Sequence, residues 1–402
     1  MEKFDYYNPV CTYFGEGRIS EISNYLKNKY KCYLLVTSKT FKSNETGHTV
    51  IGQLEKAGGK VVEIGSIPTN PKMENIYEGV DAAREHYCDC IVALGGGSVM
   101  DCSKIIAMAA RTGIDARNYL WGDADENTDS IDTVMIPTIA ATGTELNNTA
   151  VAVDKENKEK FWCYTAFPKY CFMDPQITCS LSKKLTIWGA MDILSHTFEY
   201  YMNGNMESEF QLRFSESLIM AVMDAVEKLV VAPLDVHARG EIMWCSTMTW
   251  GTGLTKIGRG EAEMSCHNIE ERFSGYFDTH HGGGLGVITP RWMLYVYKKA
   301  PEIFSRFARN VMRIDEKDDL KAAGKGINAF IGWLKKIGAP QTYSDLNPEL
   351  KFEDNELDIV AEKIWNVCHG QVGKLVPLEL TDIKEILYAG KNELEENEDE
   401  RI

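Results

Sequence analysis

Residues 90–98 read Cys90-Ile91-Val92-Ala93-Leu94-Gly95-Gly96-Gly97-Ser98, an apolar run that leads directly into three glycines and a serine. The run has the composition of a buried strand, and glycines let the backbone turn and approach a ligand closely. Ser98 can cap a following helix, with Asp101 three residues further on, so that the first backbone N–H groups face an anion such as a pyrophosphate. The stretch predicts a phosphate-binding loop, although a tight turn that binds nothing has the same outline. It matches neither G-x-x-x-x-G-K-[ST] nor G-x-G-x-x-G, which argues against kinase-type and ordinary dinucleotide-binding folds.

Alternating strand-like and helical segments flank this loop. Strands are predicted at 32–37, 60–65 and 133–138, and helices at 76–85 and 98–110. The alternation is typical of a parallel sheet with crossover helices, so an α/β nucleotide-binding domain is expected over residues 1–177. The last strand ends in a stretch rich in small and hydroxyl residues, Pro137-Thr138-Ile139-Ala140-Ala141-Thr142-Gly143-Thr144-Glu145. Open α/β sheets bind ligands at such strand ends, and a plain Ser/Thr-rich turn is the alternative.

The pattern changes after Met173-Asp174-Pro175. Long helical segments follow at 186–202, 210–231 and 239–252, and no repeat or low-complexity linker separates them from the first part. We expect an all-helical second domain over residues 178–402, packed rigidly against the first with a cleft between them. The acidic run near the C-terminus is interpreted as a solvated tail and comprises Glu393, Glu395, Glu396, Glu398, Asp399 and Glu400.

Composition narrows the class of protein. The chain has 402 residues, 43 Lys and Arg against 59 Asp and Glu, and a net charge of −16. An acidic chain without a clustered basic stripe argues against nucleic acid and anionic membranes as partners. No apolar run is long enough for a spanning helix, and the start lacks the apolar core of a signal peptide, so a cytoplasmic protein is expected. The 11 cysteines fit no disulfide framework and are expected to be mostly small buried apolar residues.

Histidines and carboxylates suggest a metal site. Asp192 and His196 are four residues apart and share one face of the helix predicted at 186–202. His267 and His281 follow, the latter directly before three glycines. One carboxylate and three neutral imidazoles suit Zn²⁺ or Fe²⁺. A surface pair or a buried structural histidine would give the same spacing.

Several blocks of the sequence resemble the iron-containing (group III) alcohol dehydrogenases, and within them the butanol-dehydrogenase-like branch. The matching blocks occur in order and cover most of the chain: Gly95-Gly96-Gly97-Ser98-Val99-Met100-Asp101, Pro137 to Glu145 as quoted above, Gly189-Ala190-Met191-Asp192-Ile193-Leu194-Ser195-His196, Glu241-Ile242-Met243-Trp244-Cys245-Ser246 and His281-Gly282-Gly283-Gly284-Leu285. The resemblance implies a dinucleotide-binding α/β domain, a helical domain and a catalytic divalent metal, Fe²⁺ or Zn²⁺, in the cleft. It further implies reversible interconversion of aliphatic aldehydes and primary alcohols by hydride transfer with a nicotinamide.

The resemblance also assigns residues by position. The implied metal ligands are Asp192, His196, His267 and His281. The implied cofactor contacts are Gly96, Gly97 and Ser98 in the pyrophosphate loop, Asp101 just beyond it, Thr138 and Thr142 at the nicotinamide end, and Asn70, Lys160 and Leu185. The run 4–15 looks like the family's opening β-hairpin, which often pairs with a second subunit, and a homodimer is expected.

Two positions depart from the family pattern. Relatives commonly carry a histidine four residues after the third ligand, where this chain has Glu271. Glu271 or His280 could replace it as proton relay, or both could be bystanders. NAD-preferring relatives place an aspartate after the first strand, where this chain has Ser38 followed by Lys39. Because a neutral hydroxyl beside a lysine tolerates a 2′-phosphate, NADP(H) is favoured over NAD(H).

Other classes of protein are compatible with the same motifs. Glycerol or polyol dehydrogenases and dehydroquinate synthase have a related two-domain fold, and a non-catalytic nucleotide- or metal-binding relative would keep the same motifs. The block that ends at His196 and the Ser38 position favour the alcohol dehydrogenase interpretation.

Overall fold

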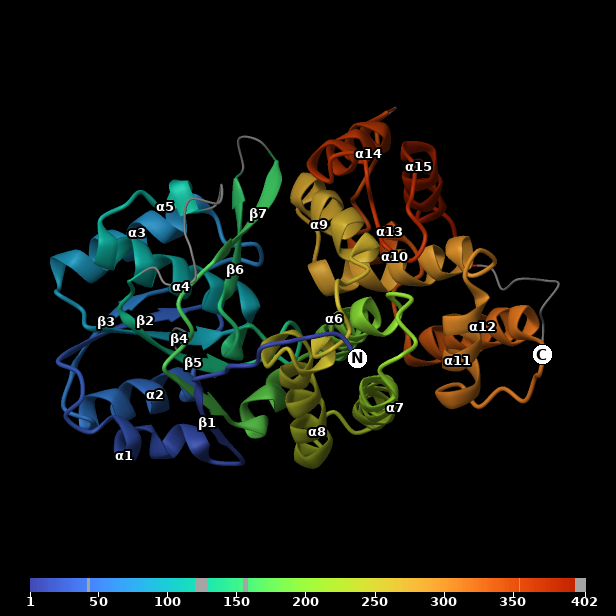
Figure 1. Cartoon of the computed structure of the whole chain (residues 1–402). Helices are drawn as coiled ribbons and strands as arrows, with labels where there is room; N and C mark the ends of the chain where they lie inside the picture. Colours follow the sequence, from blue (N-terminus) through green and yellow to red (C-terminus); the bar gives the residue numbers. More distant parts are fainter. Residues whose placement is uncertain (42–43, 120–128, 155–157, 354, 395–402) are drawn as a thin grey trace. The chain divides into compact units, whose positions relative to one another are not determined.

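The computed structural model describes residues 1–41, 44–119, 129–154, 158–353 and 355–394 (Figure 1). Most of the acidic tail, from Glu395 onward, lies outside these residues. The chain forms two compact units, which we call the α/β unit and the helical unit. The α/β unit comprises Tyr7–Leu181 and Pro233–Thr252, whereas the helical unit comprises Met1–Tyr6, Ser182–Ala232 and the chain from Gly253 onward.

A six-stranded parallel sheet forms the centre of the α/β unit. Its strand order is β1-β8-β5-β4-β2-β3, and every neighbouring pair is parallel. The strands are β1 (Cys11–Phe14), β2 (Cys32–Thr37), β3 (Lys60–Ile64), β4 (Cys90–Gly95), β5 (Asp132–Pro137) and β8 (Tyr170–Met173). β2 and β4 are buried along their whole length, as their continuous apolar sequences require when helices cover both faces of a sheet. The predicted parallel α/β fold is confirmed.

Helices cover the sheet on both faces. α1 (Ile22–Leu26) and α2 (Glu45–Lys56) lie on one face, and α3 (Met73–Glu85) and α4 (Gly97–Thr112) lie on the other, with the short α5 (Ala116–Asn118) beyond α3 (Figure 1). Leu26 of α1 and Leu54 of α2 pack in one apolar core with Leu35 and Val92 of the sheet. The strands β6 (Thr149–Asp154) and β7 (Glu159–Tyr164) form a separate antiparallel hairpin.

Two expectations about local structure were wrong. The opening segment is not a hairpin, because β1 pairs in parallel with β8 and no strand precedes it among residues 1–10. The helix predicted at 239–252 is regular only as α8 (Val236–Ser246). Thr249 leaves helical geometry, and a Cβ on Gly251 would lie 2.5 Å from the carbonyl oxygen of Gly143. The helix therefore breaks where two backbones come into direct contact.

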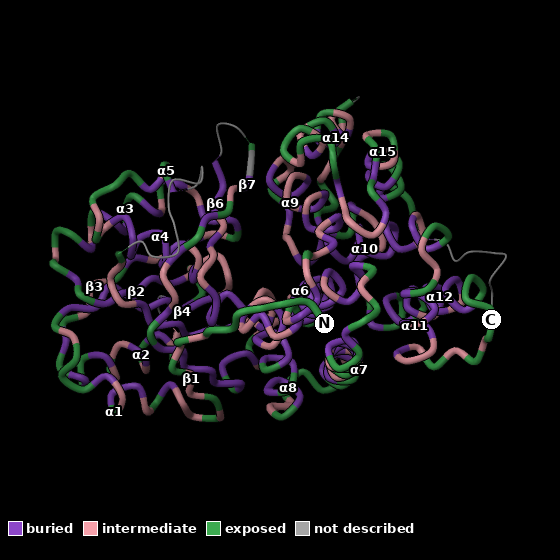
Figure 2. The backbone as a smooth tube through the Cα atoms, in the orientation of Figure 1, coloured by how far each residue is buried: buried purple, intermediate pink, exposed green. Residues whose placement is uncertain are grey.

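The helical unit is built around α6 (Lys183–Tyr201), which is almost entirely buried (Figure 2). The other helices in this unit are α7 (Glu209–Val231), α9 (Ser265–Phe277), α10 (His281–Val296), α11 (Pro301–Asn310), α12 (Asp319–Ile337), α13 (Tyr343–Leu346), α14 (Glu356–Val367) and α15 (Leu380–Ala389). α6 packs against α7 and α10, and α10 packs against α9. A helix that is apolar on all sides belongs in a core, so the charged residues on α6 stand out. Among the described residues, no helix is long and apolar enough to cross a membrane.

Candidate metal centre and cofactor loop

One face of α6 carries three buried ionisable side chains. Asp192, His196 and Glu199 lie at positions i, i+4 and i+7, which places them along one stripe of the helix. Each is less than a tenth exposed. Burying charged groups in an apolar core is costly unless they pair with one another or bind an ion. The side chains that face this stripe on neighbouring helices therefore have to supply such partners or share an ion with it.

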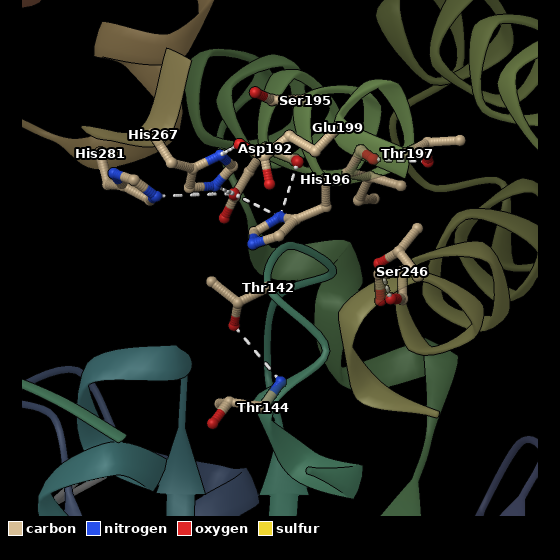
Figure 3. A network of polar contacts seen from close by, with 12 residues as sticks. Thr142, Thr144, Asp192, Ser195, His196, Thr197, Glu199, Ser246, His267 and His281 are labelled. Atoms are coloured by element: carbon tan, nitrogen blue, oxygen red, sulfur yellow. Dashed lines mark hydrogen bonds and ion pairs between the residues drawn. The ribbon is translucent and has the colours of Figure 1, made fainter. Parts of the chain in front are cut away.

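Two further helices bring histidines to this stripe. His267 lies in the first turn of α9, and His281 is the first residue of α10. One ligand atom from each of Asp192, His267 and His281 can be chosen so that all lie within 4.8 Å of one another. Asp192 Oδ1 is 4.0 Å from His267 Nε2 and 3.8 Å from His281 Nε2. Figure 3 shows both rings pointing toward the aspartate carboxylate.

The Nδ1 atom of each histidine is held by an oxygen. His196 Nδ1 donates to the backbone carbonyl of Asp192 at 2.9 Å and also lies 3.0 Å from Asp192 Oδ1. His267 Nδ1 donates to Glu199 Oε1, and His281 Nδ1 donates to Glu270 Oε2. A hydrogen bond at Nδ1 leaves Nε2 as the lone-pair nitrogen. For His267 and His281, that nitrogen is the one that faces Asp192.

Burial and charge together set the protonation of these groups. Burial alone would raise the pKa of Asp192, but the charge of His196 and a hydrogen bond from it bring that pKa well below its ordinary value. Burial and the neighbouring rings of His196 and His281 lower the pKa of His267 well below its usual range. Burial raises the pKa of Glu199 to about 8. An ionised aspartate and a neutral imidazole are the forms in which these side chains bind metals.

The donor set fits a divalent metal. His267 Nε2 is buried and has no hydrogen-bond partner among the described residues, and it faces the buried Asp192 Oδ1. Buried polar atoms without partners are rare in folded proteins and mark places where an ion or water binds. One carboxylate oxygen and imidazole nitrogens suit Zn²⁺ or Fe²⁺. His196 is outside the compact set of Asp192, His267 and His281, because its Nδ1 bonds to Asp192, but its ring lies beside that of His267, with centroids 4.3 Å apart.

Glycines allow α10 to begin close to α6 and α9. A Cβ on Gly282 would lie 2.2 Å from the backbone oxygen of Trp188, and a Cβ on Gly284 would lie 2.3 Å from Glu270 Oε1. Any larger residue at either position would push the start of α10 away from its neighbours. The glycines after His281 therefore set the depth at which this histidine enters the cluster.

The glycine loop lies at the carboxyl end of β4. α4 begins at Gly97, and Gly96 stands in the N-cap position in an extended conformation. A Cβ on Gly96 would lie 2.8 Å from Ile139 Cγ2, and one on Gly97 would lie 3.1 Å from Thr142 Oγ1. The loop is therefore in contact with the segment that follows β5. Free N–H groups at the start of a long helix are the feature that anion sites use.

The expected capping role of Ser98 was wrong. Because the helix starts before it, Ser98 sits inside the first turn, and its Oγ accepts the backbone N–H of Asn70 at 3.2 Å. Asp101 does not close a capping box either. Its carboxylate accepts Thr144 Oγ1 at 2.6 Å and the Val151 N–H at 3.1 Å. Asp101 thus ties α4 to the loop and strand that follow β5.

The other predicted residues fall into three places. Ser38 and Lys39 directly follow β2, and the Thr138 N–H donates to the Gly95 carbonyl at 3.0 Å. Lys160 is buried on β7 opposite Val153, whose N–H donates to the Pro71 carbonyl next to Asn70.

Leu185, Glu271 and His280 belong to the helical unit. Leu185 lies in the first turn of α6, Glu271 pairs with Arg272 at 2.7 Å, and the ring of His280 lies 4.7 Å from that of Trp188.

Sequence reasoning missed three buried residues near these sites. Glu199 continues the Asp192–His196 stripe one turn further, and Glu270 lies three residues after His267, so helical spacing carries a signal for both. Lys104 lies within the apolar part of α4, where a cation needs partners. Its Nζ donates to Thr144 Oγ1, Asn147 Oδ1 and the Thr149 carbonyl at 2.8–2.9 Å.

The structure thus combines a parallel α/β unit that carries a glycine loop with a helical unit that carries a carboxylate–histidine cluster fit for a divalent metal. Comparison with known proteins gives the family. Residues 9–175 match the model of iron-containing alcohol dehydrogenase, and residues 186–389 match the C-terminal model of the Fe-containing alcohol dehydrogenase family. The chain belongs to the iron-containing alcohol dehydrogenase family, and its members are oxidoreductases.

Individual relatives align along almost the whole chain. A probable NADH-dependent butanol dehydrogenase of Bacillus subtilis (strain 168) is 32% identical over 97% of this chain and 100% of its own. The NADPH-dependent aldehyde reductase YqhD of Escherichia coli (strain K12) is 26% identical over 86% of this chain and 89% of its own. The crystal structure of NADH-dependent butanol dehydrogenase A from Thermotoga maritima superposes with a TM-score of 0.91 at 31% identity, covering 98% of this chain and 99% of that one.

Proposed function

We propose that this member of the family interconverts aliphatic aldehydes and primary alcohols, as its butanol dehydrogenase relatives are named for doing. The observation that carries the proposal is the cluster of the buried Asp192 and His267 with the half-buried His281, and His196 is proposed as fourth ligand. A glycerol or polyol substrate, or binding without turnover, are the competing functions. Neither explains both a buried ligand cluster and the full-length similarity to butanol dehydrogenases.

The proposed reaction assigns a task to each group of residues. When bound, the divalent metal, Fe²⁺ or Zn²⁺, supplies Lewis-acid polarisation of a carbonyl oxygen, and the nicotinamide supplies the hydride. Asp192, His267 and His281 would hold the metal, with His196 proposed as the fourth ligand. Gly96, Gly97 and Ser98, with the start of α4, are proposed to bind the pyrophosphate, and Asn70, Asp101, Thr138, Thr142, Lys160 and Leu185 to position the rest of the cofactor.

The proposed function is tested by oxidation of NADPH and NADH with a panel of short aldehydes, with and without added Fe²⁺ or Zn²⁺. We expect turnover of butanal and its neighbours that depends on the metal. Dihydroxyacetone in place of the aldehydes tests the polyol alternative. Preference for dihydroxyacetone would replace our substrate class, and absence of turnover with every carbonyl compound would support a binding protein instead.

The proton path is proposed to use Glu271 or His280. Both belong to the helical unit, and the charge of Glu271 acts on the pKa values of Glu199 and His267 in the metal cluster. A general acid in the reaction must titrate in the pH–rate profile. Replacing Glu271 by Gln is expected to remove one limb of that profile. An unchanged profile would remove Glu271 from the mechanism and leave His280, tested by His280→Gln.

The preference between the two nicotinamide cofactors is proposed from one position. Ser38 follows β2 where an aspartate would repel a 2′-phosphate, and the exposed Lys39 beside it adds positive charge, so we propose NADP(H). The butanol dehydrogenase relatives, at 29–32% identity, are named as NADH-dependent and argue against this choice, whereas the aldehyde reductase, at 26%, is named as NADPH-dependent. A higher kcat/KM with NADPH is expected, and Ser38→Asp should reverse it. Equal values for NADH and NADPH in the wild type would end this proposal.

The remaining assignments are also proposals. We propose functional domains at residues 1–177 and 178–402. The first contains all proposed cofactor residues except Leu185, and the second contains Leu185 and the proposed metal ligands. A homodimer and a cytoplasmic location are proposed, with an aldehyde or alcohol as the small-molecule partner and neither nucleic acid nor membrane. Light scattering of the purified chain tests the dimer, and a monomeric mass would remove it.

A further inference from the structure

We propose that Glu199 and Glu270 are positioning residues that orient two of the metal-binding histidines by hydrogen bonds at Nδ1. The inference rests on the proposed metal site and deepens it. Neither glutamate has an oxygen in the compact ligand set, so both act through the histidines. The arrangement adds two buried carboxylates behind the ligands of one divalent cation.

Glu199 is placed for this task by α6 itself. It lies seven residues after Asp192, so the same helix face presents both a ligand and the support for a ligand on another helix. Its Oε1 accepts His267 Nδ1, and both side chains are almost completely buried. The contact joins α6 to α9, two segments 68 residues apart in sequence. A hydrogen bond buried away from water is stronger than one exposed to solvent, and this one fixes the plane of the His267 ring.

Glu270 repeats the arrangement between α9 and α10. It is fully buried, and its Oε2 accepts His281 Nδ1. There is space for its carboxylate because residue 284 is a glycine. A Cβ added at Gly284 would lie only 2.3 Å from Glu270 Oε1. The structure therefore provides both the acceptor and the room for it. His267 and Glu270 lie on one face of α9, so this helix also supplies one ligand and one support.

The two contacts have a common chemical consequence. With Nδ1–H donated to a carboxylate, Nε2 carries the lone pair and faces Asp192, as a metal ligand requires. A carboxylate at Nδ1 also makes the imidazole a stronger base toward the metal. His196 differs, because its Nδ1 bonds to the Asp192 backbone carbonyl instead. Removing either glutamate should therefore weaken metal binding without removing any ligand.

The test measures metal affinity rather than turnover. The full-length chain, freed of metal by chelation, is titrated with Zn²⁺ against a chromophoric competitor and with Co²⁺ by its visible absorption. Glu199→Gln and Glu270→Gln keep an oxygen acceptor at the same distance from the backbone but lose the carboxylate, whereas Glu199→Met and Glu270→Met lose the acceptor as well. We expect affinity losses of roughly 10- to 100-fold, typical for such partners, with Gln milder than Met, and an altered Co²⁺ spectrum.

A matched control separates this role from general stability. Glu216 on α7 is also buried and accepts Tyr201 Oη at 3.1 Å and Arg306 Nε at 2.5 Å, away from the cluster. Glu216→Gln should lower the unfolding temperature without changing the Zn²⁺ dissociation constant. Measuring both glutamate positions covers the case in which one variant fails to fold.

The possible results distinguish a failure of the positioning role from a failure of the proposed metal site. Zn²⁺ affinities within twofold of the wild type in both folded Gln variants and both Met variants would overturn the inference. If the wild-type chain itself binds neither Zn²⁺ nor Co²⁺, the proposed metal site fails, and the proposed function fails with it. Equal losses in Glu216→Gln would show a general effect of buried charge, and they would also overturn the positioning role.

Discussion

Lys104 is a buried cation on α4, just beyond the glycine loop. Its three hydrogen bonds all reach residues 144–149, and Thr144 in turn donates to Asp101. A buried ammonium is tolerated only when each of its N–H groups has an acceptor. Lys104 therefore holds the segment after β5 against α4, which fixes one wall of the proposed cofactor loop.

The buried position of Lys104 predicts a pH-dependent stability. Burial lowers the pKa of Lys104 to about 8, against an ordinary value of 10.5. Between these values the unfolded chain binds more protons than the folded one, so this residue makes stability rise with pH over that window. Each pKa unit corresponds to about 1.4 kcal/mol.

Urea unfolding between pH 7.5 and 10.5 checks this prediction. The free energy of unfolding of the wild type should gain about 1 to 3 kcal/mol relative to Lys104→Gln across that range. Gln keeps polar atoms at the position but cannot titrate. Parallel pH profiles for the two proteins would contradict the assigned pKa.

Single residues also show how far the sequence predicts the site. Asp192 and His196 are visible as a pair because helical spacing alone puts them on one face. Glu199 and Glu270 carry the same kind of spacing, but their partners lie on other helices, and spacing cannot show which helices meet. Ser98 was assigned the wrong contact because the start of α4 shifts when glycines occupy the N-cap and first turn.

At the scale of elements, the start of α10 depends on residues without side chains. Gly282 and Gly284 let the helix approach α6 and α9 closely enough for His281 to enter the metal cluster. Close packing leaves little room for adjustment, so one added methyl group must displace a neighbour.

Gly284→Ala is expected to lower the free energy of unfolding by about 1 to 3 kcal/mol through overpacking against Glu270. The displaced carboxylate should also weaken Zn²⁺ binding. Gly332→Ala is the control, because Gly332 lies exposed on α12 with nothing within 4 Å of the added Cβ. It should gain about 0.5 to 1 kcal/mol from helix propensity. Equal effects at the two positions, measured by urea unfolding, would contradict the packing argument.

Gly143 joins the loop after β5 to the break at the end of α8. Its φ of +73° is unfavourable for other residues, and an added Cβ would lie 2.7 Å from the carbonyl oxygen of Ser246. Gly113, at the end of α4, has a similar φ of +82° but only an arginine nitrogen at 3.8 Å.

Comparing alanine variants at Gly143 and Gly113 separates strain from collision. Gly113→Ala should cost about 1 to 2 kcal/mol, the price of a left-handed conformation. Gly143→Ala should cost more and also weaken NAD(P)H binding, since Thr142 and Thr144 flank it. Thermal unfolding and cofactor titration measure both effects. A smaller loss of stability at Gly143 than at Gly113 would refute the argued backbone contact.

The strands were predictable at this scale because fully buried strands have continuous apolar sequences, and β2 has the predicted bounds. The end of the helix expected over 239–252 was not predictable, because the helix breaks where it contacts Gly143, which is far away in sequence. The parallel pairing of β1 with β8 depends likewise on a partner about 160 residues away along the chain, as in Cys11 opposite Tyr170.

At the scale of the whole molecule, the family could be recognised from sequence because its motifs occur in order along most of the chain. The exact division into two compact units could not be predicted from sequence, because residues 233–252 belong to the α/β unit although they follow α7 of the helical unit. The proposed cofactor loop and the candidate metal cluster lie in different units. Each ligand should therefore stabilise the chain through its own set of residues.

Ligand-dependent stability tests this separation. A ligand at 100 times its dissociation constant stabilises the folded state by about 2.7 kcal/mol, so both Zn²⁺ and NAD(P)H should raise the unfolding temperature in calorimetry. In His267→Ala the shift with Zn²⁺ should vanish while the shift with cofactor persists. Loss of both shifts in this variant would contradict the assignment of the two ligands to separate residues.

The function proposed for this chain is a metal-dependent hydride transfer at the cluster of Asp192, His267 and His281. Its most direct measurement is NAD(P)H oxidation with butanal by the wild type and by His267→Ala, before and after chelation and after Fe²⁺ or Zn²⁺ is restored. Turnover by the wild type should disappear on chelation and return with the metal, and His267→Ala should stay inactive throughout. Undiminished turnover in the chelated wild type or in His267→Ala would show that the reaction does not depend on a metal at this cluster.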